Sequence, residues 1–288
     1  MDLAIDILRQ MVRWYARNAP FDKGKVRIVE AARMLNRHNR TNTLLSEVNP
    51  GMWMKLDLDS LIERQIFYFG FYRPWVLPYF DRLLTKGQTV VDVGANVGQF
   101  TLWAAKRVGT EGMVVAFEPD RSSFEKLLKN VQLNSLQGVL LENIALSNYD
   151  GEAILHLNDE LDDNKGQSSL SRLTHHRRTQ PVICQKLDNF LSQQRIRKVH
   201  VVKIDTQGAE LRVLRGAANV IEKNRPAIIL RCHEKRCRAM GDSTMAIQEF
   251  FVDRGYDLFE IHWRKGLIEV TSPRPVDDST FLALSGRQ

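Results

Sequence analysis

The sequence predicts an α/β protein with a doubly wound, mostly parallel sheet of seven strands and an N-terminal helical extension. Short apolar segments alternate with longer segments of helical periodicity from Thr89 onward, a pattern typical of a parallel sheet covered by helices. A glycine-containing turn joins the first of these strands to a helix. The chain has 288 residues, of which 43% are hydrophobic, so it is long enough to bury a full core.

Residues 1–80 form the predicted extension. Apolar residues recur at three- and four-residue steps from Ala4 to Tyr15, which predicts an amphipathic helix whose apolar stripe packs into a core rather than against a membrane. Two further helical segments are expected at 26–36 and 58–69. A short stretch of strand alternation is expected between them, at 52–57. Residues 81–288 then form the main domain.

The main domain is predicted from its strands. They are expected at Thr89–Val93, Met113–Phe117, Val139–Asn143, Val199–Ile204, Ala227–Arg231, Tyr256–Ile261 and Phe281–Leu284. Helices are expected from Gln99, over Ser122–Asn134 with a capping box that starts at Ser122, and after Gly208. The alternation breaks at about 150–187, where we expect an inserted hairpin with a polar, mobile loop at 158–180.

Composition excludes several classes of protein. The chain has 41 basic and 34 acidic side chains, a net charge of +7, and the excess occurs in short groups typical of solvated faces, so nucleic acid is not the expected partner. The three cysteines (Cys184, Cys232 and Cys237) are too few for a disulfide scaffold. No long apolar segment or signal peptide is recognisable. We therefore expect a cytoplasmic protein without a membrane span.

The glycine-containing turn predicts a ligand site, because backbone N–H groups at such a turn can approach a ligand. A dinucleotide fingerprint needs glycine at position 96, where this chain has asparagine, which argues against NAD and FAD. The spacing instead favours a ligand with a zwitterionic amino acid end. The contacts expected from this segment are Asp92, Gly94, Ala95, Asn96, Gly98, Gln99, Phe100 and Thr101.

Two further strand ends complete the predicted cofactor site. Glu118, at the end of the second strand, can accept hydrogen bonds from both hydroxyls of a ribose. Neighbouring contacts, including those around an adenine ring, are expected from Pro119, Asn143 and Ala145. Together these features predict S-adenosylmethionine as the cofactor and S-adenosylhomocysteine as its product.

Candidate catalytic residues follow the fourth and fifth strands. Asp205 is the first candidate, as a general base or as a group that orients the acceptor, and it can alternatively hold the amino group of the cofactor. His233 is the second and Glu210 the third. Lys203 shares a face with Asp205 and is expected to form a charge pair with it. Cys232, His233 and Cys237 lack a fourth ligand, so we predict no metal site.

These motifs resemble those of the FkbM family of S-adenosylmethionine-dependent methyltransferases. The resemblance covers about Trp53 to Glu260, and its segments are Arg64–Tyr72, Asp92–Thr101, Asn143–Gly151, Lys186–Phe190 and Lys203–Glu210. It implies a Rossmann-like class I methyltransferase fold and methyl transfer, often to hydroxyls of sugars or natural products. The chain departs from the family at Gln207, where the family usually has glutamate, and at Arg231–Cys232, where an acid is common.

The leading hypothesis is therefore O-methylation of a hydroxyl on a sugar or natural product. The alternatives are N-methylation of a peptide side-chain amide, a cofactor-binding regulator without turnover, and a basic RNA-binding module. The motif expected of enzymes that methylate exocyclic base amines is missing after Ile204. We expect the helical extension and the 158–180 loop to cover the acceptor site, and a homodimer is an open expectation.

Overall fold

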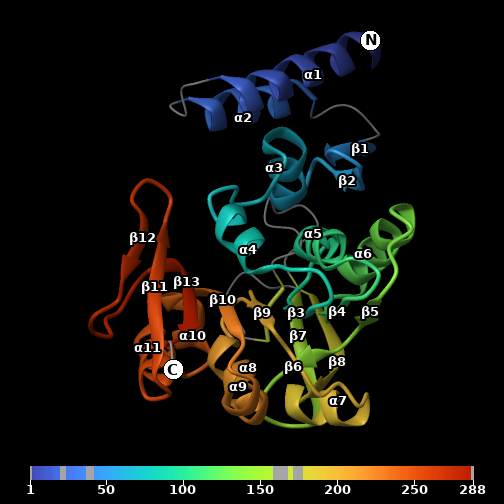
Figure 1. Ribbon diagram of the computed structural model, residues 1–288. Coiled ribbons are helices and arrows are strands. Elements are labelled where there is room, and N and C mark those ends of the chain that lie inside the picture. Colours follow the sequence, from blue (N-terminus) through green and yellow to red (C-terminus); the bar gives the residue numbers. More distant parts are fainter. Residues whose placement is uncertain (1, 20–23, 37–41, 158–167, 171–177, 287–288) are drawn as a thin grey trace. The chain divides into compact units, whose positions relative to one another are not determined.

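The computed structural model describes residues 2–19, 24–36, 42–157, 168–170 and 178–286 (Figure 1). The described residues fall into two compact units, one that ends at Pro74 and one that begins at Trp75. Most of the polar loop expected at 158–180 lies outside the described residues.

The first unit contains a β-hairpin as well as helices: its second strand lies where strand alternation was expected, at 52–57, whereas its first strand was not predicted. Its elements are α1 (Asp2–Asn18), α2 (Lys25–Asn36), β1 (Thr43–Asn49), β2 (Met52–Asp57) and α3 (Leu61–Phe69). The two strands pair in antiparallel fashion. Sequence reasoning missed β1 because one of its inward positions is the buried, polar Ser46. An apolar alternation is therefore hardly visible there.

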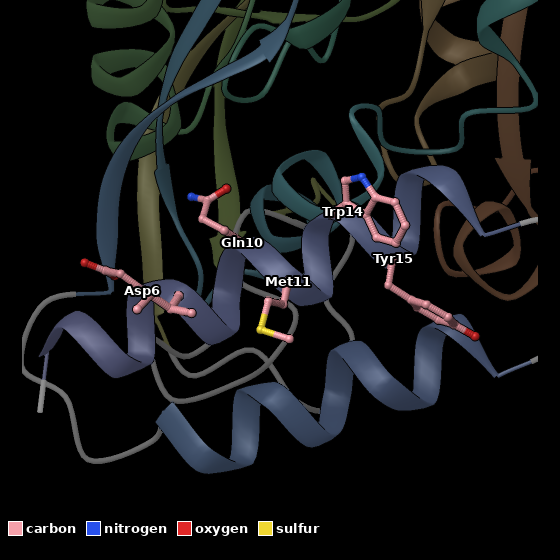
Figure 2. A pocket seen from close by; sticks show the side chains of 6 residues that line it. Asp6, Gln10, Met11, Trp14 and Tyr15 are labelled. Atoms are coloured by element: carbon pink, nitrogen blue, oxygen red, sulfur yellow. The ribbon is translucent and has the colours of Figure 1, made fainter.

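Helix α1 packs with its basic face inward. Arg9 donates a hydrogen bond to Asn42 Oδ1, Arg13 to Ser46 Oγ and Arg17 to the Phe67 carbonyl. The predicted apolar stripe is only partly in a core, because Val12 is buried whereas Met11, which lines a groove along the helix (Figure 2), is exposed. Three buried or half-buried guanidinium groups thus fix the rotation of the helix.

The second unit contains the predicted doubly wound sheet, with eight strands instead of seven. In spatial order they are β12 (Gly266–Glu269), β11 (Tyr256–His262), β13 (Asp278–Ser285), β10 (Ala227–His233), β9 (Val201–Ile204), β3 (Thr89–Val93), β4 (Met113–Phe117) and β5 (Val139–Glu142). Five neighbouring strands of this sheet are parallel, namely β10, β9, β3, β4 and β5. The other three, β13, β11 and β12, are antiparallel to their neighbours. The additional strand, β12, is a four-residue edge strand without a buried face, which explains why no pattern predicted it.

Helices cover both faces of this sheet (Figure 1). They are α4 (Leu77–Leu83), α5 (Gln99–Val108), α6 (Arg121–Leu133), α7 (Leu187–Gln193), α8 (Glu210–Gly216), α9 (Ala218–Asn224), α10 (Glu234–Ala239) and α11 (Thr244–Val252). Along β3, Val91 and Val93 enter one core and Val90 enters the other, as the two-residue period of a strand requires. Each helix in the described part of the chain is too short or too polar to span a bilayer.

Helix α6 begins differently from the expected capping box. Its N-cap is Asp120, whose carboxylate accepts hydrogen bonds from the backbone N–H groups of Ser122 and Ser123. An aspartate at this position satisfies two N–H groups that have no partner within the helix. The cap therefore lies two residues before the predicted Ser122 and ties the end of β4 to the start of α6.

The segment inserted between β5 and β9 forms a small sheet of its own. Its strands are β6 (Ala145–Leu146), β7 (Gly151–Leu157) and β8 (Arg178–Gln185), in the order β6-β8-β7. The β7–β8 pair is antiparallel and forms the hairpin that was expected in this inserted segment. Ala145 packs with Leu155, Val182 and Cys184 in the core beneath this sheet.

Candidate active site

The turn after β3 has a backbone shape that only glycine accommodates. Gly94 has φ of 74°, and an ideal Cβ built on it would lie 2.1 Å from the carbonyl oxygen of Asp205. Its N–H group donates to the Phe117 carbonyl at 2.9 Å. Gly98, at the start of α5, has φ of 95° and a hypothetical Cβ 2.5 Å from Leu127 Cδ1. The two glycines let the turn pack closely against β4, β9 and α6.

Beneath the turn lies a buried ion pair. Lys203 Nζ is 3.1 Å from Asp92 Oδ1 and donates a hydrogen bond to the Gly94 carbonyl at 2.8 Å. Thr101 Oγ1 donates to the other oxygen of Asp92 at 2.7 Å. The prediction that Lys203 pairs with Asp205 is therefore wrong. The register of β3 against β9 is the reason, because it places Asp92 directly opposite Lys203.

This pair supports the turn from inside. Asp92 has no exposed surface and Lys203 is almost fully buried, so neither charged group is available to a ligand in this conformation. Removing one partner would leave the other charge buried and uncompensated, a change that is strongly destabilising. Asp92 and Lys203 therefore support the turn from below. They do not lie among the side chains that a cofactor or an acceptor can contact.

The predicted ribose acid lies beside the turn. Glu118 Oε2 accepts from the backbone N–H of Asn96 at 2.8 Å, and Oε1 accepts from the N–H of Asp120 at 2.9 Å. Burial raises the pKa of Glu118 to about 8, and the charge of Asp120 adds to this effect. The two N–H bonds and the charge of Lys203 oppose the rise. Each carboxylate oxygen keeps a second lone pair for a further donor.

Asn143 joins this group from the end of β5. Its side-chain amide donates to the carbonyl oxygens of Glu118 at 2.8 Å and of Pro119 at 3.1 Å. The structure therefore brings together Glu118, Pro119 and Asn143. It does not place the side chain of Ala145 with them, because that side chain lies in the core of the small sheet.

Asp205 sits in a charged network at the ends of β9, β10 and β13. Its Oδ1 accepts a hydrogen bond from Gln207 Nε2 at 2.9 Å and lies 3.6 Å from Arg231 Nη1. Arg231 also donates to both carboxylate oxygens of Asp278, at 3.1 and 3.3 Å. The side chain of Asp205 is 17% exposed. One hydrogen bond and one ion pair thus hold this carboxylate at the edge of the sheet.

Glu210 has a different environment from Asp205. It is buried, and burial raises its pKa. Both oxygens accept from the Gly208 N–H at 3.0 Å, and Oε1 also accepts from the N–H of Thr206. Cys237 Sγ lies 3.7 Å from Oε2. The carboxylate therefore closes the turn between β9 and α8 and has no exposed oxygen to offer an acceptor.

His233 ends β10 and occupies the N-cap position of α10, although its side chain makes no capping hydrogen bond there. Its Nδ1 is buried and has no hydrogen-bond partner among the described residues. Burial lowers its pKa, as do the charges of Arg236 and Arg231, whereas Asp278 opposes them. A lowered pKa keeps the imidazole neutral at physiological pH, the form that can accept a proton.

Sequence reasoning missed several residues of the site. Asp278 lies on β13, which pairs with β10 in antiparallel fashion and so places Asp278 opposite His233. No local sequence pattern predicts this position. Ser169 Oγ donates to the Gln207 carbonyl at 2.8 Å, and Ser168 Oγ donates to Asp120 Oδ2 at 2.7 Å. Gln207 was recognised as a departure from the FkbM pattern, but its hydrogen bond to Asp205 was not predicted.

A family model and several relatives match this chain. Residues 92–258, more than half of the chain, match the model of the Methyltransferase FkbM domain. Two relatives are "Methyltransferase 1" of Beauveria bassiana, 30% identical over 44% of this chain and 57% of its own length, and "Methyltransferase sdnD" of Sordaria araneosa, 26% identical over 46% and 61%. The chain thus spans about six-tenths of the length of either relative.

Among solved structures, methyltransferase FkbM from Methylobacillus flagellatus aligns with a TM-score of 0.43 and 14% identity, over 68% of this chain and 43% of that one. The family match begins at Asp92 beneath the glycine turn and includes Glu118, Asp205 and His233. It begins within β3 and ends within β11, so it includes the parallel strands β4, β5, β9 and β10 in full. The chain belongs to the FkbM methyltransferase domain family.

Proposed function

We propose that this protein is an S-adenosylmethionine-dependent methyltransferase that methylates a hydroxyl group on a sugar or natural product. The observation that carries the proposal is the convergence of three strand ends: the Gly94 turn, Glu118 and Asp205 meet at the carboxyl edge of the sheet. In open α/β sheets, ligands bind at this edge. The membership of the chain in the FkbM methyltransferase domain family supports methyl transfer.

The residues present fit S-adenosylmethionine. The turn at 94–98 leads directly into α5, and backbone N–H groups at the start of a helix favour an anionic group such as the carboxylate of this cofactor. Glu118 has lone pairs left for the hydroxyls of a ribose. Asn143 lies exposed beside Glu118 for contacts near the base. Asp92 and Lys203 act indirectly, by holding the turn.

When bound, the cofactor supplies a methyl group that is already activated by a sulfonium. The protein then has to hold the acceptor within about 3–3.5 Å of that methyl group and accept a proton from the hydroxyl. Asp205 is the first candidate for this role, because it is partly exposed and its orientation is held by Gln207 and Arg231. His233 is the second, through its neutral imidazole. Proton acceptance by such a group contributes about 10²–10⁴-fold.

The first test is calorimetric titration of the protein with S-adenosylmethionine and, separately, with NAD. We expect binding of S-adenosylmethionine alone. Incubation with hydroxyl-bearing sugars and with amide-bearing peptides, followed by mass spectrometry, then identifies the acceptor by a gain of one methyl group. Methylated peptide amides would favour the N-methylation alternative. Cofactor binding without methylation of any acceptor would favour a regulator, and failure to bind the cofactor would refute the proposal.

Cofactor binding is expected to release protons near neutral pH. Because the pKa of Glu118 is raised to about 8, this carboxyl is mostly protonated at pH 7. A cationic ligand with ribose hydroxyls favours the ionised form, so binding should expel close to one proton at pH 7 and almost none at pH 9. Affinity should rise with pH by at most tenfold per unit up to about pH 8 and then level off.

Titrations in two buffers with different ionisation enthalpies measure this release. Glu118→Gln should abolish the proton release and weaken binding. Glu152→Gln, which changes an exposed acid on β7, is the matched control and should leave both unchanged. A pH-independent affinity in the unmodified protein would contradict the assigned role of Glu118.

A further inference from the structure

Residues 168–170 form a short segment that is fastened to the small sheet. Ser169 and His156 of β7 exchange two backbone hydrogen bonds, at 2.8 and 2.9 Å. The side chain of Leu170 packs against the core beneath that sheet, and Ser169 is 1% exposed. The backbone of the segment is therefore held independently of the hydroxyl groups of Ser168 and Ser169, which we call the serine pair.

Ser168 holds the loop that carries the predicted ribose acid. Its Oγ donates a hydrogen bond to Asp120 Oδ2 at 2.7 Å, while Oδ1 of the same carboxylate caps α6. The backbone N–H of Asp120 donates in turn to Glu118 Oε1. From β8, Gln180 Nε2 donates to the Pro119 carbonyl at 2.8 Å. The small sheet and its serine pair thus fix the loop after β4 at two points.

Ser169 holds the turn that follows Asp205. Its Oγ donates to the Gln207 carbonyl at 2.8 Å. Gln207 has φ of 59°, a left-handed conformation that a residue with a side chain keeps only where its surroundings impose it. Glu210 accepts hydrogen bonds from the N–H groups of the residues before and after Gln207. Ser169 and Glu210 together therefore impose the conformation of Gln207.

The conformation of Gln207 decides which oxygen of Asp205 is available. Gln207 Nε2 donates to Asp205 Oδ1 at 2.9 Å, and Arg231 Nη1 lies 3.6 Å from the same oxygen. The other oxygen, Oδ2, accepts no hydrogen bond from the residues that the structure describes. If Gln207 relaxes to a right-handed conformation, its amide leaves Oδ1 and the carboxylate can close onto the guanidinium with both oxygens. Gln207 therefore keeps Oδ2 available.

We propose that Ser169 is a positioning residue for methyl transfer, which acts through Gln207 and keeps Oδ2 of Asp205 available to the acceptor hydroxyl. The inference rests on the proposed function, in which Asp205 accepts the proton. Glu118 and Asp205 follow different strands, and the serine pair bridges their two loops from a third element, the small sheet. A misplacement of about 1 Å between reacting groups can cost about 10²-fold in rate.

A crystal structure of Ser169→Ala tests the geometry without any acceptor. The variant keeps both backbone bonds to His156 and the packing of Leu170, so the segment should stay in place. We expect Gln207 Nε2 to move out of hydrogen-bond distance of Asp205 Oδ1, and the carboxylate to close onto Arg231. An unchanged contact between Gln207 and Asp205 would overturn the proposal.

Turnover measures the consequence, with S-adenosylmethionine and the sugar or peptide that the unmodified protein methylates. Ser169→Ala should lower kcat about tenfold or more and change the affinity for S-adenosylmethionine less than about twofold. Ser168→Ala should show the opposite split, with a cofactor affinity about two- to tenfold lower and nearly normal kcat at saturating cofactor. The matched control Ser147→Ala removes another buried serine hydroxyl, one that donates to Asn148, and should change neither quantity.

Combined variants show whether Ser169 acts through Gln207 and Asp205. Gln207→Met keeps the length of the side chain and the backbone contact with Ser169 but removes the donor. It should lower kcat as much as Ser169→Ala, and the double variant should lose no more than either. In the Asp205→Asn background, Ser169→Ala should change kcat by less than about twofold.

The outcomes separate this inference from the proposed function. Equal losses of kcat from Ser169→Ala in the unmodified and Asp205→Asn backgrounds would show a merely structural role and overturn the inference alone. A loss of cofactor affinity in Ser169→Ala as large as its loss of kcat would do the same. No methylation of any acceptor by the unmodified protein would overturn the proposed function, and this inference with it.

Discussion

Asp205→Asn should lower the turnover rate of the enzyme by about 10²–10⁴-fold while cofactor affinity changes only a few-fold. The substitution keeps the shape of the side chain and an oxygen that can accept from Gln207. Arg231 remains paired with Asp278 through two hydrogen bonds, so no guanidinium is stranded and the fold should persist. Single-turnover kinetics and a cofactor titration of the same variant measure the two effects separately.

Two comparison variants make this result interpretable. Glu210→Gln replaces the oxygen that accepts from the Gly208 N–H and the Cys237 thiol by a donor, so that donors face each other in a buried place, at a cost of about 1–3 kcal/mol. It should therefore lower stability and turnover together. Asp257→Asn removes an exposed acid on β11 and should leave both unchanged. Full turnover in Asp205→Asn would exclude Asp205 as the proton acceptor and make His233 the first candidate.

Gly94→Ala should reduce cofactor affinity at least tenfold and destabilise the fold. A left-handed backbone costs a residue with a side chain about 1–2 kcal/mol. The added methyl group would also meet the Asp205 carbonyl at 2.1 Å, an overlap that must displace the turn or β9, and overpacking of this kind costs about 1–3 kcal/mol. Chemical denaturation and calorimetric titration provide the two readouts.

Gly87 offers a matched control for this variant. It has φ of 78°, close to that of Gly94, yet an added Cβ would find no atom within 4 Å. Gly87→Ala should therefore show the backbone strain alone, with normal cofactor binding. The difference between the two variants isolates the contact with Asp205. Equal destabilisation with normal binding in both would show that the turn relaxes around the methyl group.

The predicted parts of the site are those with local patterns. The glycine spacing, the acid at the end of β4 and the polar residues after β5 and β9 follow directly from where each strand ends. The contacts that these residues make with one another were harder to predict. Lys203 was expected at Asp205 because the two share a face of β9, yet the register of two separate strands places Asp92 opposite Lys203. A spacing within one strand contains no information about the neighbouring strand.

The sequence by itself determined the class of the fold, the alternation of strands and helices, and the position of the glycine turn, because hydrophobic periodicity and backbone requirements act over short segments. Only the tertiary structure decided that Arg231 from β10 and Asp278 from the antiparallel β13 meet at Asp205. It also decided which side of α1 faces inward, since the acceptors of its arginines lie 33 to 50 residues away. Contacts between distant segments depend on strand order, register and helix rotation, which no single segment encodes.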